Sequence, residues 1–384
     1  MKIGIISLYY KNHNYGGLLQ CYALTNYLKQ LGFEAEQVTY DRFISRPIGK
    51  KFQSVEFAKI PQKMIGKLVN RTTEVLNKIQ NRLYAKDAIA GRKEKYQQFE
   101  ESIPHSVKIY NVNNIEEACV YYDAFICGSD VVWSGAIDEY VAALGFANKP
   151  KIKISYAASL GGTSPDYQWF DTYGRYLADL KYISVREKEI EEKLSSKGYN
   201  ARTDIDPVML LNSDEWDKIS AKSNIHNKYA FAYLLGDSIE TREAIREYCK
   251  RKELTLVTIP YCNNGKYRKC DRNFGDKWIK AAGPSDFLGL IAGAQIVFTD
   301  SFHATVFSLI FEKEFYSFRR IDNGIDYSLR VQNLLSWMEL DIRLLNPGEL
   351  IMQENSIDFS SVKLKIEDGR SKAKDYLKSS LSVK

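Results

Sequence analysis

One unit recurs along this chain: a short run of β-branched and aromatic residues, a loop, and then a segment with helical periodicity. The first unit begins with "KIGIISL", continues through the loop "YYKNHNYGG" and enters "LLQCYALTNYLKQLG", after which "FEAEQVTY" has the pattern of a strand. One face of the predicted helix carries five apolar residues: Leu19, Tyr22, Ala23, Tyr27 and Leu31. Strands that alternate with amphipathic helices predict an α/β chain, with a parallel sheet covered by helices.

Two series of these units follow each other. The first includes "YDAFICGSD", "KIKISYAASLG" and "YISVREKEIEEKL", and the second includes "YAFAYLLG", "LTLVTIP", "QIVFTDSF" and "EFYSF". We therefore predict two Rossmann-like domains that face each other across a cleft, at residues 1–204 and 205–345. The tail, residues 346–384, has the pattern of a mostly polar helix that either crosses back to the first domain or lies on the surface.

Composition narrows the class of protein further. Because 45% of the 384 residues are apolar, the chain can bury more than one core. No apolar run approaches the ~18 residues of a membrane-spanning helix, and the start "MKIGIISLYYKNHNYGG" lacks the apolar length of a secretory signal. The six cysteines form no Cys-x-x-Cys pair, which favours reduced thiols over a zinc site or a disulfide framework. These features predict a cytoplasmic protein.

Positive charge is concentrated in one insertion, which we place at about residues 42–100 of the first domain. From Arg42 to Gln97 there are fourteen Lys/Arg and four Asp/Glu, although the whole chain is only +6. Apolar residues recur there at helical spacing and basic residues fall largely on the other faces: Ile60, Met64, Leu68, Val75, Ile79 and Leu83 against Lys63, Lys67, Arg71, Lys78 and Arg82. This helix either meets an anionic membrane or a phosphate-bearing acceptor, or packs on the protein with its charges in solvent. Nucleic acid is not expected, because the aromatic and glycine punctuation of nucleic-acid-binding modules is missing.

Chemically useful residues follow the predicted strands at their carboxyl ends, where α/β proteins bind ligands. His303, one of only four histidines, stands where "QIVFTDSF" gives way to a helix. Asp130 ends "CGSD" and acts either as a base or sugar ligand, or as part of an ordinary helix-capping loop. The loop "NYGG" brings Asn14 and lets the backbone approach a ligand at Gly16 and Gly17.

Two further patterns bear on cofactors. The loop "NYGG" lacks the Gly-x-Gly-x-x-Gly order, so no dinucleotide cofactor is expected. The triplet "DID" at Asp204 to Asp206 mimics the Asp-x-Asp of metal-using glycosyltransferases. Because it leads directly into a proline after a strand, we interpret it as a structural linker and predict no metal.

Six segments, in order along the chain, resemble the polysaccharide pyruvyl transferase family. They are "NYGGLLQCYALTNYLKQLGF", "YDAFICGSDVVW", "ISYAASLG", "ISVRE", "DPVMLL" and "GPSDFLGLIAGAQIVFTDSFHATVFSLIF". Residues 42–97 and the last forty carry no segment diagnostic of the family. One position departs from the family pattern, because Ala304 stands where a glycine usually follows the histidine.

The resemblance implies a two-domain fold like that of the GT-B glycosyltransferases. It also implies transfer of the pyruvyl unit of phosphoenolpyruvate onto two hydroxyls of a sugar in a surface-polysaccharide precursor. The product is a cyclic ketal, phosphate is released, and no cofactor beyond the donor substrate is expected. A lipid-linked oligosaccharide is one acceptor that fits, with peripheral contact at the inner face of the membrane.

The family's chemistry assigns roles to the candidate residues. Phosphoenolpyruvate carries a carboxylate and a phosphate, so Arg186, at the start of a predicted helix, either binds this donor or pairs with Glu187 or Glu189. His303 is expected to move protons, with Asp300 orienting it or touching the acceptor. His13 is a second candidate base. The remaining substrate-binding candidates are Asn14, Gly16, Gly17, Ser129, Ser301 and Arg330, the last with a surface salt bridge as its alternative role.

Two other functions stay open from the sequence. A GT-B glycosyltransferase that uses a nucleotide sugar would share the fold, because a fold does not fix a function. A catalytically silent carbohydrate-binding scaffold would bind sugar without turnover. Phosphate release from phosphoenolpyruvate distinguishes the pyruvyl transferase from both.

Overall fold

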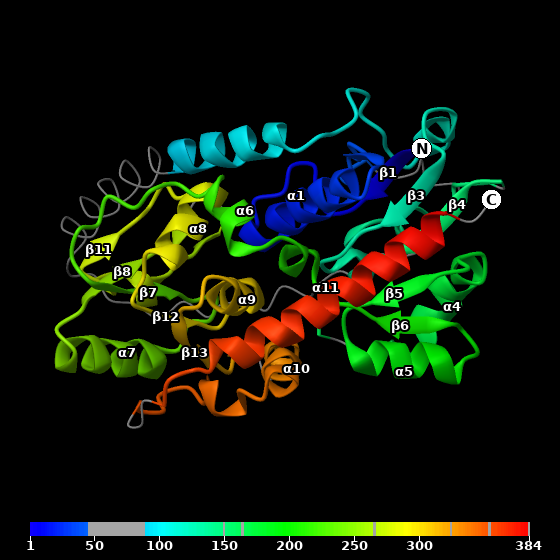
Figure 1. Ribbon diagram of the computed structural model, residues 1–384. Helices are drawn as coiled ribbons and strands as arrows, with labels where there is room; N and C mark the ends of the chain where they lie inside the picture. The colour runs from blue at the N-terminus through cyan, green and yellow to red at the C-terminus, as the bar shows by residue number, and fades with distance from the viewer. Residues whose placement is uncertain are drawn as a thin grey trace, which may run out of the picture.

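Two parallel sheets, one in each half of the chain, organise the molecule (Figure 1). The computed structural model describes residues 1–44, 89–148, 150–162, 165–263, 266–322, 325–351 and 355–382. The basic amphipathic helix predicted at residues 60–83 lies outside the described residues.

The first sheet has the strand order β2-β1-β3-β4 and is parallel throughout. Single parallel bridges from Ile154 to Tyr182 and from Ala158 to Val185 extend it to the pair β5-β6. The elements of this half are β1 (Lys2–Ile6), α1 (Tyr15–Gln30), β2 (Glu34–Gln37), a helix at 89–102, η1 (Ile115–Val120), β3 (Ala124–Cys127), η2 (Val132–Ala136), α3 (Glu139–Ala142), β4 (Ile152–Ser155), α4 (Tyr167–Leu177), β5 (Ile183–Val185), α5 (Lys188–Ser196) and β6 (Ala201–Thr203).

The second sheet has the order β11-β8-β7-β12-β13-β16, and all of its neighbouring strands run parallel. The elements of this half are η3 (Pro207–Leu210), α6 (Ser213–Asp217), β7 (Tyr229–Tyr233), α7 (Ile239–Arg251), β8 (Thr255–Thr258), β9 (Cys262–Asn263), β10 (Lys266–Tyr267), η4 (Lys269–Asp271), β11 (Lys277–Trp278), α8 (Pro284–Ala292), β12 (Ile296–Thr299), α9 (Phe302–Ile310), β13 (Glu314–Phe318), β14 (Ile321–Asp322), β15 (Ile325–Asp326), α10 (Leu329–Met338), η5 (Asp341–Arg343) and β16 (Leu344–Leu345). The central strands β7 and β12 are buried along their whole length, as expected for strands covered on both faces.

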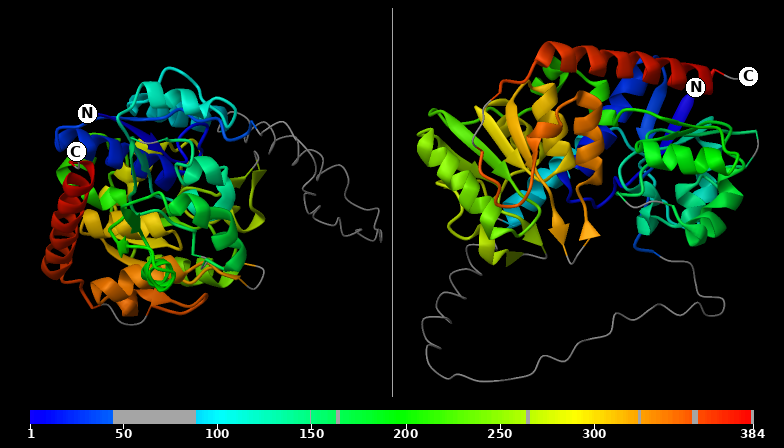
Figure 2. Two further views of the ribbon diagram at one scale, coloured as in Figure 1. Left: turned by 90° about the vertical axis from the view of Figure 1, so that its right-hand side faces the viewer. Right: turned by 90° about the horizontal axis from the view of Figure 1, so that it is seen from below.

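The final helix, α11 (Phe359–Leu381), runs from the second half back across the first (Figures 1 and 2). Its Tyr376 hydroxyl donates to the carbonyl of Ser155 at 2.8 Å, and Arg370 donates to the carbonyls of Met209 and Leu211 at 2.6 and 2.7 Å. Gly369 lets the helix come close, because a Cβ there would lie 2.6 Å from Ile205. The helix therefore ties the first sheet to the segment that joins the two halves.

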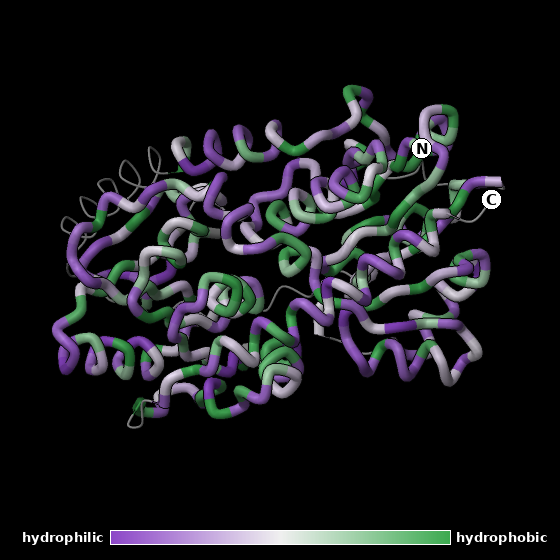
Figure 3. Tube along the Cα trace, in the orientation of Figure 1, coloured by the Kyte–Doolittle hydropathy of each residue, from purple (hydrophilic) through white to green (hydrophobic). Residues whose placement is uncertain are grey.

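One apolar cluster continues from the first half into the second. The buried side chains of α1 meet those of α8, where the rings of Tyr15 and Phe287 stack at 4.7 Å. Figure 3 colours the chain trace by hydropathy and shows hydrophobic residues, in green, in both halves. Because a shared apolar core resists relative motion, this packing fixes α1 against the second half, which matters for the site below.

Candidate active site

A cavity of about 750 Å³ lies between the two halves and is lined by residues from both. Several of the sequence candidates line it: Asn14, Gly16, Asp130, Asp300, Ser301, His303 and Arg330. All but Arg330 come from the carboxyl ends of β1, β3 and β12 and the starts of the helices that follow, as parallel strand topology requires, and Arg330 lies at the start of α10. We call this space the main cavity.

The imidazole of His303 lies against the first turn of α1. A Cβ atom at Gly16 would be 1.9 Å from His303 Nδ1 and 2.3 Å from its Cγ, so no residue with a side chain fits there without displacing the ring. The sequence predicts that the backbone of Gly16 approaches a ligand. In the structure, the imidazole of His303 fills the space that a side chain at position 16 would occupy.

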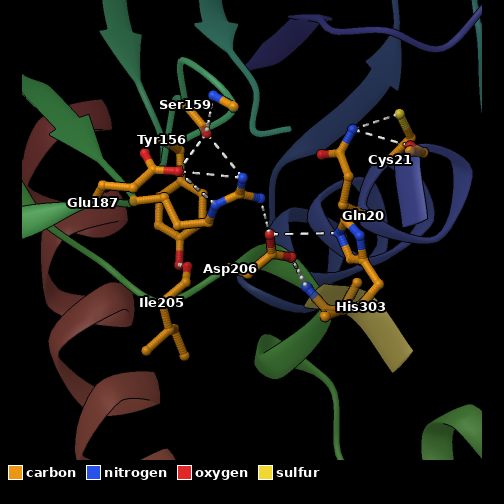
Figure 4. Close-up of polar contacts among 12 residues, drawn as sticks. Gln20, Cys21, Tyr156, Ser159, Glu187, Ile205, Asp206 and His303 are labelled. Atoms are coloured by element: carbon orange, nitrogen blue, oxygen red, sulfur yellow. Dashed lines mark hydrogen bonds and ion pairs between the residues drawn. The ribbon is translucent and has the colours of Figure 1, made fainter. Parts of the chain in front are cut away.

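Asp206 joins His303 to Arg186. Its Oδ2 accepts a 2.6 Å hydrogen bond from Arg186 Nη1 and lies 3.7 Å from His303 Nε2. Figure 4 shows the Asp206 carboxylate pointing toward His303, and this carboxylate is fully buried. Its other oxygen accepts from the amide of Val208 at 3.1 Å, which caps η3. The aspartate that sequence reasoning treats as a linker is thus the acidic partner of the histidine.

The charge state of Asp206 follows from these neighbours. Burial alone would raise its pKa, but His303 and Arg186 outweigh that effect and hold the pKa of the Asp206 carboxyl well below its usual value. The carboxylate therefore stays ionised, and it presents a fixed negative charge to the imidazole.

Asp300 does not contact His303 in this way. Its two oxygens accept 2.6 Å hydrogen bonds from the amides of Leu235 and Gly236, which follow β7. Burial raises the pKa of the Asp300 carboxyl despite these two donors. The Asp300 side chain thus anchors the loop after β7, and the orienting contact to His303 comes from Asp206.

Ser301 and Asp130 stand at strand ends that open on the main cavity. Ser301 is the N-cap residue of α9, yet its side chain makes no capping hydrogen bond. Asp130 has a left-handed backbone with φ of 62°, a conformation that costs about 1–2 kcal/mol in a residue with a side chain. Such strain at a cavity wall is typical of functional positions.

Two other first-half candidates, Asn14 and Gly17, have structural contacts, and within the described residues Ser129 has none through its hydroxyl. Asn14 is the N-cap of α1 and accepts from the amide of Gly17 at 3.1 Å. A Cβ at Gly17 would lie 2.3 Å from Asn12 Nδ2, so this glycine also makes room for a neighbouring side chain. Ser129 is fully buried with no hydrogen-bond partner for its hydroxyl among the described residues, and it does not line the main cavity.

Arg330 brings positive charge to the wall of the main cavity. No carboxylate of the described residues forms an ion pair with it, and its Nε has no hydrogen-bond partner there. Burial and the nearby Arg186 lower the pKa of its guanidinium to about 10. A cation that is partly removed from water without a paired anion destabilises the free protein. An anionic ligand that pairs with this cation removes the penalty, so the site favours such a ligand.

Sequence reasoning missed most of the cations that line the main cavity. They are Arg92, Lys93, Arg268 and Arg320, and among the described residues two carboxylates, Asp130 and Asp300, line it with them. Arg320 follows β13 by two residues, and this position after a strand could have identified it as a cavity residue. Arg92 comes from the helix at 89–102, where nothing in the sequence distinguishes it from its basic neighbours.

Arg186 lies behind this wall. It is buried and donates to Asp206, Ser159 and Glu187, the pairing with a local carboxylate that the sequence left as an alternative. It lines a separate cavity of about 390 Å³ under α11. Phe302 divides the two spaces, with the guanidinium carbons of Arg186 and Arg330 at 4.6 and 5.9 Å from its ring centre. Arg186 and His303 thus meet through Asp206, while Arg186 itself lines the neighbouring cavity.

The described residues also bear on metals and membranes. Within these ranges, no group of three or more His, Cys, Asp or Glu side chains is arranged to hold a metal ion. Among the helices that the structure describes, none is both long and apolar enough to cross a membrane.

Comparison with solved structures defines the class of fold. The chain is similar to a putative UDP-N-acetylglucosamine 2-epimerase from Listeria monocytogenes, with 13% identity and a TM-score of 0.52 over 98% of this chain and 90% of that one. It is also similar to the UDP-GlcNAc 2-epimerase from Neisseria meningitidis bound to UDP-GlcNAc (9% identity, TM-score 0.51, 99% of both chains). Arabidopsis thaliana UGT89C1 complexed with UDP-L-rhamnose matches with 9% identity and a TM-score of 0.52, over 98% of this chain and 97% of that one. The chain therefore has the two-domain α/β fold of the GT-B type, as predicted.

Within that class, the family model of the polysaccharide pyruvyl transferases matches residues 14–323, most of the chain. The chain belongs to the polysaccharide pyruvyl transferase family, which confirms the resemblance found in the sequence. A comparison with curated proteins found no match.

Proposed function

We propose that this protein transfers the pyruvyl group of phosphoenolpyruvate to two hydroxyls of a sugar in a surface-polysaccharide precursor, with no cofactor beyond that donor. The observation that carries the proposal is the main cavity itself. It combines an imidazole, His303, with an excess of cations over carboxylates, and the family membership supports a transferase activity for the protein.

The donor is proposed to bind through its two anionic groups at Arg320, Arg330 and the amino terminus of α9. The free amides of a helix start attract phosphate, and Ser301 leaves them without a side-chain cap. Arginine suits this task because its planar fork donates two parallel hydrogen bonds to carboxylate or phosphate. Arg186 supports the site from behind through Asp206 rather than by direct contact.

His303 is proposed to move the protons, since an imidazole titrates near neutral pH and this one faces the main cavity. Asp206 holds it in place, with Gly16 leaving the room for its ring. Asp130 is the proposed ligand or base for the acceptor hydroxyls, because it projects from the opposite half of the same cavity.

The reaction balances without a redox partner. Two sugar oxygens add to C2 of phosphoenolpyruvate, C3 gains one proton and becomes a methyl group, and the C2–O bond to the phosphate breaks. The two hydroxyl protons are thereby accounted for, one on C3 and one on the released phosphate. Because phosphoenolpyruvate is an intermediate of cytoplasmic metabolism, we propose that the reaction takes place in the cytoplasm.

The experiment is a phosphate-release assay with phosphoenolpyruvate against a panel of simple and lipid-linked glycosides. We expect release that depends on both substrates and a product whose mass increases by one pyruvyl unit. Turnover of a nucleotide sugar without phosphoenolpyruvate would instead identify a glycosyltransferase. Sugar binding without turnover of either donor would identify a carbohydrate-binding scaffold.

A further inference from the structure

A second cavity, of about 630 Å³, adjoins the main cavity in the first half of the molecule. His13 and Lys93 line both spaces, so the two are neighbours across these side chains. The second cavity lies between the loop after β1, the helix at 89–102 and the segment around residues 105–109. We call it the outer cavity.

The outer cavity has an apolar rim that faces solvent. Val107 is 99% exposed, Phe43 67% and Ile109 48%, and all three line it together with Tyr9 and Tyr10. Charged side chains line it as well, namely Lys11, Lys93, Glu100 and Glu101. Single exposed apolar residues are common, but three around one cavity form the kind of patch that binds an apolar partner. These three side chains are not part of the buried core clusters.

Positive charge marks the boundary between the two cavities. Burial and then the charges of Lys93 and Arg92 lower the pKa of the His13 imidazole. The guanidinium of Arg92 lies over Tyr15, at 5.2 Å from the ring centre, and its buried Nη1 has no hydrogen-bond partner among the described residues. A phosphate at this boundary would supply the acceptor atoms that Arg92 lacks.

We propose that the outer cavity binds the apolar chain of a lipid-linked acceptor, with the linking phosphate at Arg92 and Lys93 and the sugar in the main cavity. The inference rests on the proposed function and adds to it the place where the lipid part lies. Along such an acceptor, the sugar is followed by the phosphate and then by the hydrocarbon chain. The main cavity, the cationic boundary and the apolar rim follow one another in the same order.

The test compares two acceptors that carry the same sugar, one joined by a diphosphate to a polyprenyl chain and one as a short methyl glycoside. Val107→Asp and Phe43→Asp place a charge on the apolar rim at exposed positions, where folding is little affected. Each is expected to raise KM for the polyprenyl acceptor about 10-fold or more, since an apolar group of that size contributes about 1.5 kcal/mol or more when buried. KM for phosphoenolpyruvate and for the methyl glycoside should stay unchanged.

Val120→Asp is the matched control, because Val120 is also an exposed valine (82%) but lies on η1, outside the residues that line the cavity. It should leave every constant unchanged. The inference is overturned if the rim variants use the polyprenyl acceptor normally, or if they lose the methyl glycoside equally.

Direct binding separates this inference from the proposed function. If no acceptor gives phosphate release, the proposed function fails, and flotation with phosphatidylcholine vesicles that contain polyprenyl diphosphate still tests the cavity. Binding that needs the polyprenyl diphosphate and weakens in Val107→Asp supports the inference. Equal binding by the variant, or equal binding to anionic vesicles without polyprenyl diphosphate, overturns it.

Discussion

The imidazole of His303 occupies the space that any side chain at position 16 would need, with Nδ1 1.9 Å from the place of a Cβ on Gly16. The two residues come from opposite halves of the molecule, so the glycine at the start of α1 sets how close α9 and its histidine can approach. The site thus depends on the docking of the two halves as well as on the chemistry of its side chains.

Gly16→Ala should therefore damage the site more than the fold. We expect turnover to fall about 100-fold, because a shift of roughly 1 Å in a catalytic group has effects of that size, with a stability loss of about 1–3 kcal/mol from overpacking. Phosphate release and thermal unfolding measure the two effects. Gly91→Ala is the control: it also lies in a helix, but its nearest neighbour would be Ala281 at an ordinary 3.4 Å. Normal turnover in Gly16→Ala would show that the position of His303 is not critical.

Asp206→Asn should lower the free energy of unfolding at neutral pH by about 3 kcal/mol, because it removes the nearer of the two carboxylates that pair with buried Arg186 and leaves Glu187 at 3.4 Å as the other. The pKa of Asp206 is lower in the folded protein than in the unfolded chain, so its stabilising contribution is present above the unfolded value of about 3.9 and is lost as the pH falls below it. Denaturant unfolding between pH 3 and 7 measures this difference. An unchanged difference between wild type and variant across that range would contradict the ion-pair assignment.

Arg330→Met should weaken donor binding while it stabilises the protein. The guanidinium is only partly exposed and forms no ion pair among the described residues, so its replacement by an apolar side chain is expected to raise the free energy of unfolding by about 1 kcal/mol. KM for phosphoenolpyruvate should rise about 10- to 100-fold, the effect of losing a charged hydrogen bond. Arg343→Met is the control, because Arg343 is buried but pairs with Glu314 at 2.8 Å away from the cavity. The Arg343→Met variant should lose stability and keep its KM for phosphoenolpyruvate. A loss of stability in Arg330→Met would instead show that Arg330 has a structural partner.

His303→Gln keeps much of the size and hydrogen-bonding capacity of the side chain but removes its ability to titrate. Turnover should fall about 10²- to 10⁴-fold, with only a modest change in phosphoenolpyruvate binding. Steady-state phosphate release and direct donor titration separate the two constants. Should the folded variant keep near-normal turnover, proton transfer belongs to another group, and Asp130 and His13 would be tested next.

Much of the fold was predictable from local pattern. Short apolar runs and helical periodicity identified the strands and helices of both sheets, because these signals depend on residues close in sequence. They say less about where an element ends, such as the end of β6 at Thr203. Asp206 then caps a new helical turn, which the apolar run "PVMLL" does not reveal.

The sequence by itself determined the α/β class, the family and the position of His303 at the end of a strand. Each of these depends on short segments whose order and local geometry follow from the chain alone. Only the tertiary structure decided that Asp206 rather than Asp300 partners His303, that Arg186 lies behind the cavity wall, and that Arg92 and Arg320 join Arg330 around the main cavity. The physical reason is that these contacts link residues far apart in sequence, and they form only when the shared apolar core and α11 hold the two halves together.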